Sequence, residues 1–292
     1  LGNQEVRTAG IIAAHLKALG LEVKEKVAVT GVVGILRGGK PGPVVALRAD
    51  MDGLPVTERG DLPFKSKVVT EFNGQKTGVM HACGHDAHVA ILMAVAEILA
   101  SEKANLAGTV KFIFQPSEEG VYDSKGEKVL AGAELMVKEG VLENPAPKNI
   151  FGMHVHTAME KGKLSFRGGM AMASADEIYI TIKGKGGHAA APQLTADTIL
   201  IASNLIVSLQ QLISRNNSPF NPSVLSITSF HGGNTTNVIP SEVKLMGTFR
   251  AMNEEWRYEA HELIKKLSTQ LVESMGATID IKIDIGYPFV LN

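Results

Sequence analysis

The sequence predicts an α/β protein with two domains, and three observations support this prediction. The chain has 292 residues, a length that typically corresponds to about two domains. Its first part alternates helical segments with strands that are apolar on both faces, which is typical of a sheet covered by helices on both sides. From about residue 172, strands with one polar face alternate with helices in the order β-α-β-β-α-β of a ferredoxin-like domain.

Hydrophobic periodicity locates the elements of each part. In the first part, a helical segment over 4–19 ends at Gly20, a residue suited to the end of a helix. The other segments expected there are strands at 31–38, 43–52, 109–116 and 149–155, and helices at 87–102 and 130–140. The second part is expected to have strands at 174–185, 223–230, 242–250 and 278–286, and helices at 195–214 and 253–275.

Charge and composition exclude several classes of partner. The 29 Lys and Arg residues nearly balance the 30 Asp and Glu residues, and no basic stripe occurs, so we expect neither nucleic acid nor a membrane as a partner. The single cysteine, Cys83, excludes an internal disulfide and fits a reducing compartment. We therefore expect a cytoplasmic protein, with the reservation that the chain starts at Leu1 without a methionine and a signal peptide could have preceded it.

Four short stretches rich in Asp, Glu, His and Cys are expected to converge. Three of them follow the predicted strands, and the fourth stands just before the long helix. They are "RADMDGLP" (48–55), "QPSEEG" (115–120), "GMHVH" (152–156) and "HACGHDAH" (81–88). Because ligand sites of open α/β sheets form outside the carboxyl ends of the strands, the sequence predicts one functional site at this edge.

Each of these stretches also has a simpler interpretation. Cys83 and His85 are suited to a metal such as zinc, and the start of the following helix favours a thiolate, but a buried cysteine beside helix-capping histidines has the same pattern. Glu118 and Glu119 allow one carboxylate to bind a metal while its neighbour accepts a proton, although paired glutamates are common on surfaces. His154, alone, is typical of a hydrogen-bonded core histidine.

Two glycine-rich stretches occur in the second part. "KGKGGHAAAP" (183–192) has three glycines just before His188. These glycines either let the backbone approach a ligand or simply connect a strand to a helix. "HGGNTTNVIP" (231–240) and Arg250 offer amide and guanidinium donors that suit a carboxylate. Each signal is weak by itself.

Together, the motifs resemble those of one family in their order along the chain. "RADMDGLP", "MHACGHDAH", "QPSEEG", "GMHV", "GKGGHAAAP" and "GGNTTNVIP" are similar to the amidohydrolase branch of the aminoacylase/carboxypeptidase G metallopeptidases. That branch includes hippurate hydrolases, N-acyl-amino-acid amidohydrolases and plant auxin-conjugate hydrolases. The resemblance implies a mixed-sheet α/β/α catalytic domain that binds two divalent metal ions (Zn, Mn, Co or Ni) and carries an inserted ferredoxin-like lid domain, which also forms a homodimer.

The resemblance implies roles for residues of the first part. The implied metal ligands are Cys83, His85, Glu119 and His154. Glu118 would be the general base, and Asp52 would orient a metal ligand. The roles of Asp50, His81 and His88 stay open: Asp50 stands where relatives outside this branch have a histidine ligand, and the two histidines are expected to support ligands or cap the helix.

In the second part, the resemblance implies residues that act on the substrate. His188 would steady the developing oxyanion, often in the partner subunit's site, while Asn237 and Arg250 would hold the substrate carboxylate. The implied domains are a catalytic domain at 1–171, continued by 287–292, and a lid at 172–286. The family has a further histidine ligand near its C-terminus and another in its N-terminal segment. Because neither is present here, we interpret the chain as truncated at both ends and expect its second metal to be weakly held.

The expected function is metal-dependent hydrolysis of the amide bond of N-acyl amino acids or related small conjugates by an activated water. One alternative makes Cys83 a nucleophile activated by His81 or His85, which predicts resistance to chelators and loss of activity on alkylation. Another alternative is a non-catalytic dimeric binding protein on the same fold. Retention of both Glu118 and Glu119 favours the hydrolase.

Overall fold

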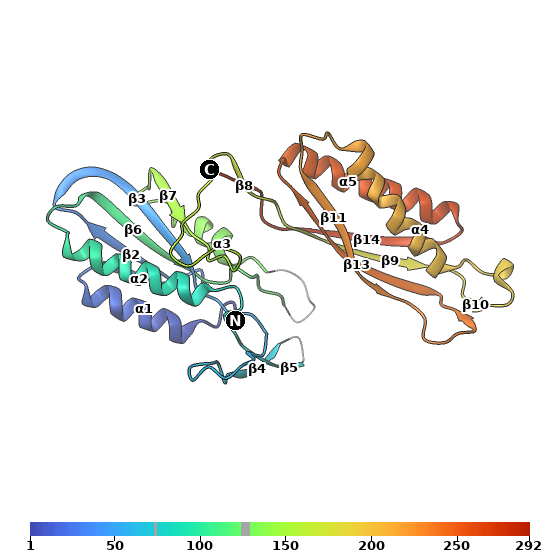
Figure 1. Cartoon of the computed structure of the whole chain (residues 1–292), viewed down its shortest axis with the longest axis horizontal. Coiled ribbons are helices and arrows are strands. Elements are labelled where there is room, and N and C mark those ends of the chain that lie inside the picture. Colours follow the sequence, from blue (N-terminus) through green and yellow to red (C-terminus); the bar gives the residue numbers. More distant parts are fainter. Residues whose placement is uncertain (73–74, 124–128) are drawn as a thin grey trace. The chain divides into compact units, whose positions relative to one another are not determined.

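The computed structural model describes residues 1–72, 75–123 and 129–292. Internal contacts divide the chain into two units, 1–161 and 162–292. Each unit has its own main sheet and its own hydrophobic core (Figure 1). The domain boundaries predicted from the sequence, at 171 and 286, stay a prediction. In the structure, β8 (Met170–Met172), near the start of the second unit, pairs with β15 (Val290–Leu291) at the end of the chain.

A mixed five-stranded sheet forms the centre of the first unit, as predicted. Its strand order is β1-β2-β6-β3-β7. Strand β3 runs parallel to both β6 and β7, whereas β2 is antiparallel to β1 and to β6. The strands of this unit are β1 (Glu22–Val27), β2 (Gly31–Arg37), β3 (Lys40–Asp50), β6 (Ala107–Gln115) and β7 (Asn149–Gly152), with a separate hairpin of β4 (Val69–Phe72) and β5 (Gln75–Gly78).

Helices lie on both faces of this sheet. The helices are α1 (Val6–Ala18), α2 (His85–Ser101) and α3 (Gly132–Lys138). Alternate residues of β6 point to opposite faces: Phe112 and Phe114 join the core beneath α1 and α2, whereas Ile113 packs with Met136 of α3. This two-sided burial explains why apolar residues occupy successive positions of the predicted strand at 109–116.

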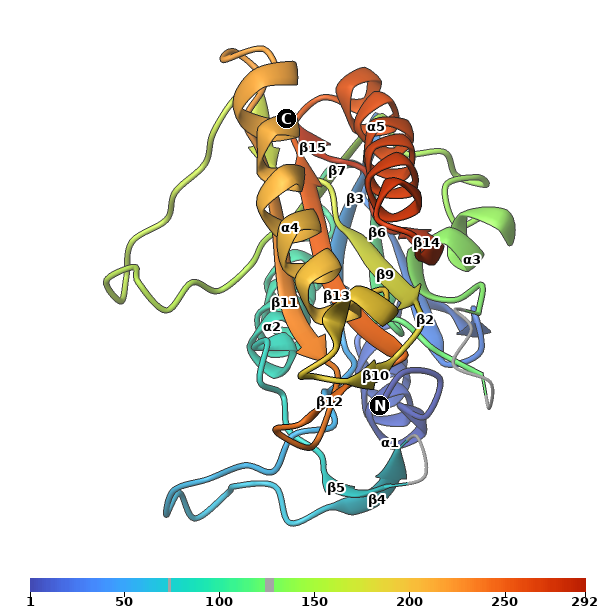
Figure 2. The same cartoon turned by 90° about the vertical axis from the view of Figure 1, so that its right-hand side faces the viewer.

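The second unit has the βαββαβ order that the sequence predicts. Its antiparallel sheet has the strand order β11-β13-β9-β14, and two helices bury their apolar residues against it (Figure 2). The main elements are β9 (Asp176–Lys183), α4 (Thr198–Gln211), β11 (Ser223–His231), β13 (Glu242–Ala251), α5 (Glu254–Ser274) and β14 (Thr278–Ile285). Strand β9 alternates buried and more exposed residues, which agrees with the predicted single polar face.

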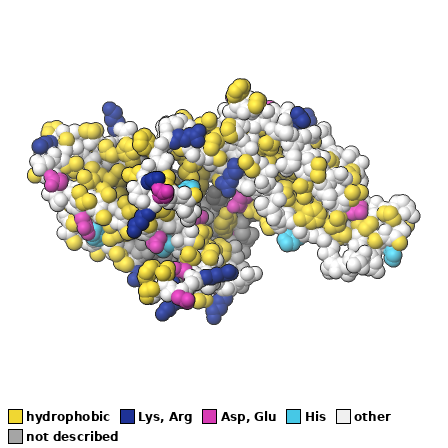
Figure 3. All heavy atoms as spheres, in the orientation of Figure 1, with side chains coloured by type: hydrophobic (Ala, Val, Ile, Leu, Met, Phe, Trp, Pro, Cys, Tyr) yellow, Lys and Arg dark blue, Asp and Glu magenta, His cyan; other side chains and the backbone are white. Residues whose placement is uncertain are grey.

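Several short elements complete the second unit. Two small ribbons pair β8 (Met170–Met172) with β15 (Val290–Leu291) and β10 (Gly187–His188) with β12 (Val238–Ile239). A 3-10 turn covers Pro192–Leu194, and α4 continues into a π turn at Leu212–Asn216. In the part of the chain that the structure describes, no helix combines the length and apolarity needed to cross a membrane. On the face drawn in Figure 3, basic and acidic side chains are interspersed.

Candidate metal centre

Three strand ends place the acidic and histidine motifs at one edge of the first sheet. In the parallel ladder, Asp50 pairs with Gln115, and Arg48 pairs with Gly152. Figure 1 shows β3 together with its neighbours β6 and β7. The stretches that contain Asp52, Glu118 and His154 therefore leave the sheet side by side. The convergence expected from the strand assignments is thus present in the structure.

Two backbone turns with left-handed geometry bring these stretches together. Gly84, which precedes α2, has φ +82°, and a Cβ there would lie 2.3 Å from the Cγ2 atom of Val155. Only glycine therefore allows the Cys83–His85 stretch to approach the loop of His154 this closely. After β6, Ser117 has φ +51°. This left-handed turn directs the next two residues, Glu118 and Glu119, toward His85.

His85 lies at the middle of the site. Its Nδ1 atom lies 3.0 Å from the carbonyl oxygen of Asp52 and 3.1 Å from the Asp52 Oδ1 atom, so Nδ1 carries the proton and donates it. In the neutral ring the opposite atom, Nε2, is then an acceptor, yet it is buried and has no hydrogen-bond partner among the described residues. A buried polar atom without a partner requires an explanation, and a metal ion is a direct one.

Carboxylate oxygens face this free nitrogen. The Nε2 atom of His85 lies 3.8 Å from Oε2 of Glu118, 3.8 Å from Oε1 of Glu119 and 3.7 Å from Oδ2 of Asp50. The Oε1 atom of Glu119 is likewise buried and unpartnered among the described residues. The backbone N–H of Glu119 donates to Oδ2 of Asp52 at 3.0 Å, so Asp52 holds both His85 and Glu119. Two unpaired acceptors that face each other suit a shared cation.

Cys83 and His154 form a second pair of donor atoms. The Cys83 Sγ atom lies 3.3 Å from Nε2 of His154. The Nδ1 atom of His154 lies 2.6 Å from the carbonyl oxygen of Val155, so Nδ1–H donates there and leaves the Nε2 lone pair facing the sulfur. His85 closes this group, since one donor atom of each of Cys83, His85 and His154 lies within 4.8 Å of the others.

The charges around Cys83 disfavour a nucleophilic thiolate. Burial, followed by the carboxylates of Glu119 and Glu118, raises the pKa of the Cys83 thiol to about 12. The start of α2 is expected to favour the thiolate, but the carboxylates outweigh it. Reactive cysteines lie in electropositive surroundings, whereas a thiolate in this acidic site needs a cation beside it.

Burial and charge also shift the pKa values of the neighbouring groups. Burial and the carboxylate of Glu119 raise the pKa of Glu118 above its ordinary value. Burial by itself raises the pKa of Asp52, but hydrogen bonds from His85 and from the Glu119 N–H outweigh it and lower that pKa. Burial by itself lowers the pKa of His85, but its bond to Asp52 and the nearby carboxylates raise it. Asp52 is therefore ionised, and Glu118 is the better proton acceptor.

Asp50 and His88 are buried beside His85 and contact each other. His88 Nδ1 lies 2.5 Å from Oδ1 of Asp50, and His88 Nε2 accepts the backbone N–H of Val155 at 2.9 Å. Both ring nitrogens of His88 are therefore occupied by protein groups. Asp50 also accepts from Arg48 at 2.7 Å, and Arg48 in turn donates to Gln115 at 2.8 Å. Arg48 was not predicted as a site residue. The i, i+2 spacing of Arg48 and Asp50 on one strand, which places both on the same face, could have indicated it.

His81 contacts the backbone of the same loop. Its Nδ1 atom lies 3.0 Å from the carbonyl oxygen of Asp52, and its own carbonyl accepts the N–H of Gly84 at 3.1 Å. This agrees with a capping or supporting position. Its role, like the assignment of the other site residues, stays a prediction.

The residues expected to bind substrate lie in the second unit and are exposed. His188 and Asn237 come together at the β10–β12 ribbon, where the N–H of Ala189 donates to the Asn237 carbonyl at 3.0 Å. The N–H of Ala190 donates to Nδ1 of His188 at 3.1 Å, so the neutral ring has its proton on Nε2. Arg250 lies near the far end of β13, eight residues beyond Glu242, a separation of about 26 Å along a strand.

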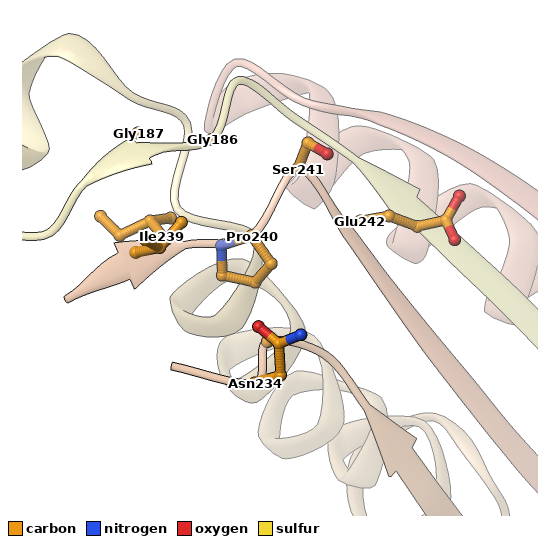
Figure 4. Close-up of a pocket in the computed structure, with 9 residues that line it drawn as sticks. Gly186, Gly187, Asn234, Ile239, Pro240, Ser241 and Glu242 are labelled. Atoms are coloured by element: carbon orange, nitrogen blue, oxygen red, sulfur yellow. The ribbon is translucent and has the colours of Figure 1, made fainter. Parts of the chain in front are cut away.

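The glycines of "KGKGGH" have a packing role. A Cβ at Gly186 would lie 2.6 Å from the Ile239 carbonyl oxygen, and one at Gly184 would lie 2.7 Å from that of Ala196. These approaches between backbones support the connecting interpretation of the motif. A hollow of about 600 Å³ lies beside the ribbon (Figure 4). Its lining includes Glu242, whose carboxylate lies 3.3 Å from Nζ of Lys244, and does not include His188, Asn237 or Arg250.

Comparison with known proteins identifies the family. Residues 46–292 match the sequence profile of Peptidase family M20/M25/M40. The chain belongs to this family. The resemblance inferred from the six motifs is therefore confirmed, and it places the metal-ligand candidates within a family of peptidases.

Relatives of this M20-family chain include amidohydrolases. It is 42% identical over 291 residues to IAA-amino acid hydrolase ILR1-like 5 of Arabidopsis thaliana, covering 99% of this chain and 62% of the relative. It is 38% identical over 292 residues to hippurate hydrolase of Campylobacter jejuni, covering 100% of this chain and 71% of the relative. The chain thus spans less than two thirds of the length of the plant relative.

Solved structures show the same fold. A putative aminohydrolase from methicillin-resistant Staphylococcus aureus matches with a TM-score of 0.85 at 35% identity, over 100% of this chain and 73% of that one. The YXEP protein of Bacillus subtilis, described as a dinuclear metal binding peptidase from the M20 family, matches with a TM-score of 0.76 at 35% identity, over 100% of this chain and 71% of that one. The mixed α/β fold is therefore that of the M20 peptidases.

Proposed function

We propose that the protein is a metal-dependent amidohydrolase that cleaves the amide bond of N-acyl amino acids or related small conjugates. One observation carries the proposal: the buried Nε2 of His85 and the buried Oε1 of Glu119 face each other at 3.8 Å and have no partner among the described residues. The names of the relatives, which include hippurate hydrolase and N-acyl-L-amino acid amidohydrolase, support the substrate class.

The residues present fit two divalent ions. Cys83, His85 and His154 would hold one ion, and the Glu118–Glu119 pair beside His85 offers carboxylate ligands for a second, adjoining ion. Because only Nε2 of His85 is free, His85 itself would bind one of the two ions. Thiolate, imidazole and carboxylate together suit zinc, manganese, cobalt or nickel. Of the pair, Glu119 is the proposed ligand because its Oε1 is the unpartnered atom. Metal ions at these ligands would supply a Lewis acid that acidifies a water molecule and polarises the amide carbonyl.

The side chains of this chain would then accept and donate the protons of the reaction. Glu118, with its raised pKa, takes a proton from the attacking water as the O–C bond forms. It returns that proton to the amide nitrogen as the C–N bond breaks, which releases an amino acid and a carboxylate. Asp52 keeps His85 in the tautomer that leaves Nε2 free, and the Nε2–H of His188 is a suitable donor to the developing oxyanion.

We further propose that the active protein is a homodimer. His188 and Asn237 share one ribbon of the second unit, whereas Arg250 lies near the far end of β13. A single copy of this unit therefore does not present all three side chains to one small substrate. Two copies would allow Arg250 of one subunit to act with His188 and Asn237 of the other. The family resemblance also implies a homodimer, with His188 reaching the site of the partner subunit.

The substitution Glu118→Gln tests the proposed general base. It keeps the size of the side chain and removes the proton acceptor, so kcat for hippurate should fall by about 10²- to 10⁴-fold. Binding of Zn²⁺, measured by elemental analysis after dialysis, should be retained. The measurement compares kcat and metal content in the same preparation.

Glu134→Gln is a matched control, because Glu134 is an exposed carboxylate of α3 outside the site. It should keep the wild-type rate. Full activity of Glu118→Gln would rule out its role as the base. A wild-type protein that binds metal and acyl-amino acids without hydrolysing them would instead favour a binding protein.

A further inference from the structure

The turn that presents the glutamate pair is held in place by the N-terminal segment. Ser117 directly precedes Glu118, is almost fully buried and has φ +51°. A serine rarely adopts this left-handed conformation unless surrounding groups impose it. The contacts of Ser117 therefore determine where the next two carboxylates point.

Glu5 makes the principal contact with this turn. Its Oε1 atom accepts the backbone N–H of Ser117 at 2.9 Å, and its Oε2 atom accepts the hydroxyl of Thr30 at 2.6 Å. Glu5 is only 5% exposed, so this carboxylate is buried with both oxygens bonded to neutral donors. It stands at the N-cap of α1, where a negative charge is favourable, yet it makes no capping hydrogen bond to that helix. Its bonds are instead made to residues 25 and 112 positions away.

Asn3 and Gly132 enclose the same turn. The backbone N–H of Asn3 donates to the Ser117 hydroxyl at 2.9 Å, and that hydroxyl donates to Oδ1 of Asn3 at 2.9 Å. A Cβ at Gly132 would lie 2.6 Å from the Ser117 carbonyl oxygen, so the chain on that side also approaches closely. The N–H and the hydroxyl of Ser117 are thus held by hydrogen bonds, and its carbonyl is closely packed against Gly132.

We propose that Glu5 is a positioning residue for the Glu118–Glu119 pair. By fixing the N–H of Ser117, it sets the left-handed turn from which Glu118 and Glu119 face Nε2 of His85. Glu5 acts on the pair through its hydrogen bond to Ser117, which is neither a proposed metal ligand nor the proposed base. The inference rests on the proposed hydrolase function, and it adds a residue that none of the sequence motifs indicates.

Three variants separate positioning from general stability. Glu5→Ala removes both acceptors, and we expect kcat for hippurate to fall by about 10- to 100-fold with weaker Co²⁺ binding. Glu5→Gln keeps an acceptor for the Ser117 N–H and a donor for Thr30, so its kcat should stay within about threefold of wild type. Gln4→Ala, at the exposed neighbouring position, is the matched control and should keep wild-type kcat.

The measurements are kcat and KM for hippurate, Co²⁺ affinity from its visible absorption, and the melting temperature. Positioning predicts a fall in kcat with little change in KM, and recovery in Glu5→Gln. Adding Ser117→Gly to Glu5→Ala should restore part of the rate, because glycine adopts the left-handed turn without strain. If Glu5→Ala does not fold, Asn3→Gly, which preserves the positive φ of Asn3, should lower kcat by itself.

The outcomes distinguish this inference from the proposed function. If wild type hydrolyses hippurate and Glu5→Ala keeps kcat and Co²⁺ affinity, the positioning role is wrong. The same holds if Glu5→Gln loses as much activity as Glu5→Ala, because the charge at the helix start would then be what matters. If wild type neither binds Co²⁺ nor hydrolyses acyl-amino acids, the proposed function itself fails.

Discussion

At the scale of single residues, the account depends on the orientation of His85. Asp52 occupies Nδ1 through its carbonyl and its carboxylate, which leaves Nε2 buried and free. A histidine held in this way by a carboxylate is the usual arrangement of a metal ligand. The same carboxylate also accepts the Glu119 N–H, so one buried aspartate fixes the positions of two candidate ligands, His85 and Glu119.

The substitution Asp52→Asn should therefore weaken metal binding. An asparagine amide can accept the His85 N–H, but its NH₂ group would then face the N–H of Glu119, two donors against each other. We expect the affinity for Zn²⁺ to fall by about 10- to 100-fold, measured by calorimetric titration. Asp86→Asn, on the exposed first turn of α2, is the control and should bind as wild type does. Equal affinities in all three proteins would contradict the proposed role of Asp52.

Residue types and spacing were enough to predict the candidate ligands, and contacts from distant segments were not. Cys83, His85, Glu119 and His154 belong to motifs whose residue types suit a metal. Glu5 and Ser117 do not, because Glu5 resembles any acidic residue at a helix start, and the left-handed turn of Ser117 depends on groups more than a hundred positions away. Such long-range hydrogen bonds leave no local pattern.

At the scale of elements, the predicted strands at 31–38, 43–52 and 109–116 agree with β2, β3 and β6, because each contains a run of buried or half-buried apolar residues. Strand β1 was not predicted, since its sequence "EVKEKV" is charged and mostly exposed. The pair of β4 and β5 and the two small ribbons were also missed, because strands of two to four residues are too short to show a periodic pattern. Pairing partners, rather than apolar residues, define these elements.

A buried ion cluster joins three elements of the second unit. Asp176 of β9 accepts from Arg257 of α5, from Nε2 of His261 and from the N–H of Gly286 after β14. Burial by itself raises the pKa of Asp176, but these bonds outweigh it and hold that pKa well below its usual value. The cluster therefore joins the start of β9 to the first turns of α5 and to the residue that follows β14.

The substitution Asp176→Asn should destabilise this unit by about 3–5 kcal/mol, because it removes the buried carboxylate of Arg257 and leaves only the partly exposed Glu254 to pair with it. Trp256 is the only tryptophan and lies buried in α5, so its fluorescence reports unfolding of this unit in urea. Asp280→Asn is the control, since Asp280 pairs with Lys183 on the surface, and it should change the midpoint little.

The same cluster predicts a pH dependence. A carboxyl whose pKa is lower in the folded state stabilises the fold above the unfolded value of about 4, and this contribution is lost as pH falls below it. The midpoint of Trp256 fluorescence should therefore drop on going from pH 5 to pH 3 in wild type, and drop less in Asp176→Asn. An equal drop in both proteins would show that Asp176 does not contribute to this dependence.

At the scale of the whole molecule, the M20-family assignment gives the fold, and the geometry of the first unit gives the proposed chemistry. Candidate ligands for two ions meet at the carboxyl ends of parallel strands, with a proton acceptor beside them. The acidic surroundings of Cys83 argue against a cysteine nucleophile. The sequence did not indicate that His188 and Arg250 lie far apart in the second unit, because their separation depends on the β10–β12 pairing, which places His188 next to Val238, a few residues before β13.

The most direct test of the central claim is the rate of hippurate hydrolysis before chelation, after chelation and after return of a divalent metal. The account predicts that removing metal with a chelator abolishes the rate and that zinc, manganese, cobalt or nickel restores it, because the attacking water depends on the metal. Hydrolysis that continues at full rate in the metal-free protein, and stops when Cys83 is alkylated, would contradict it.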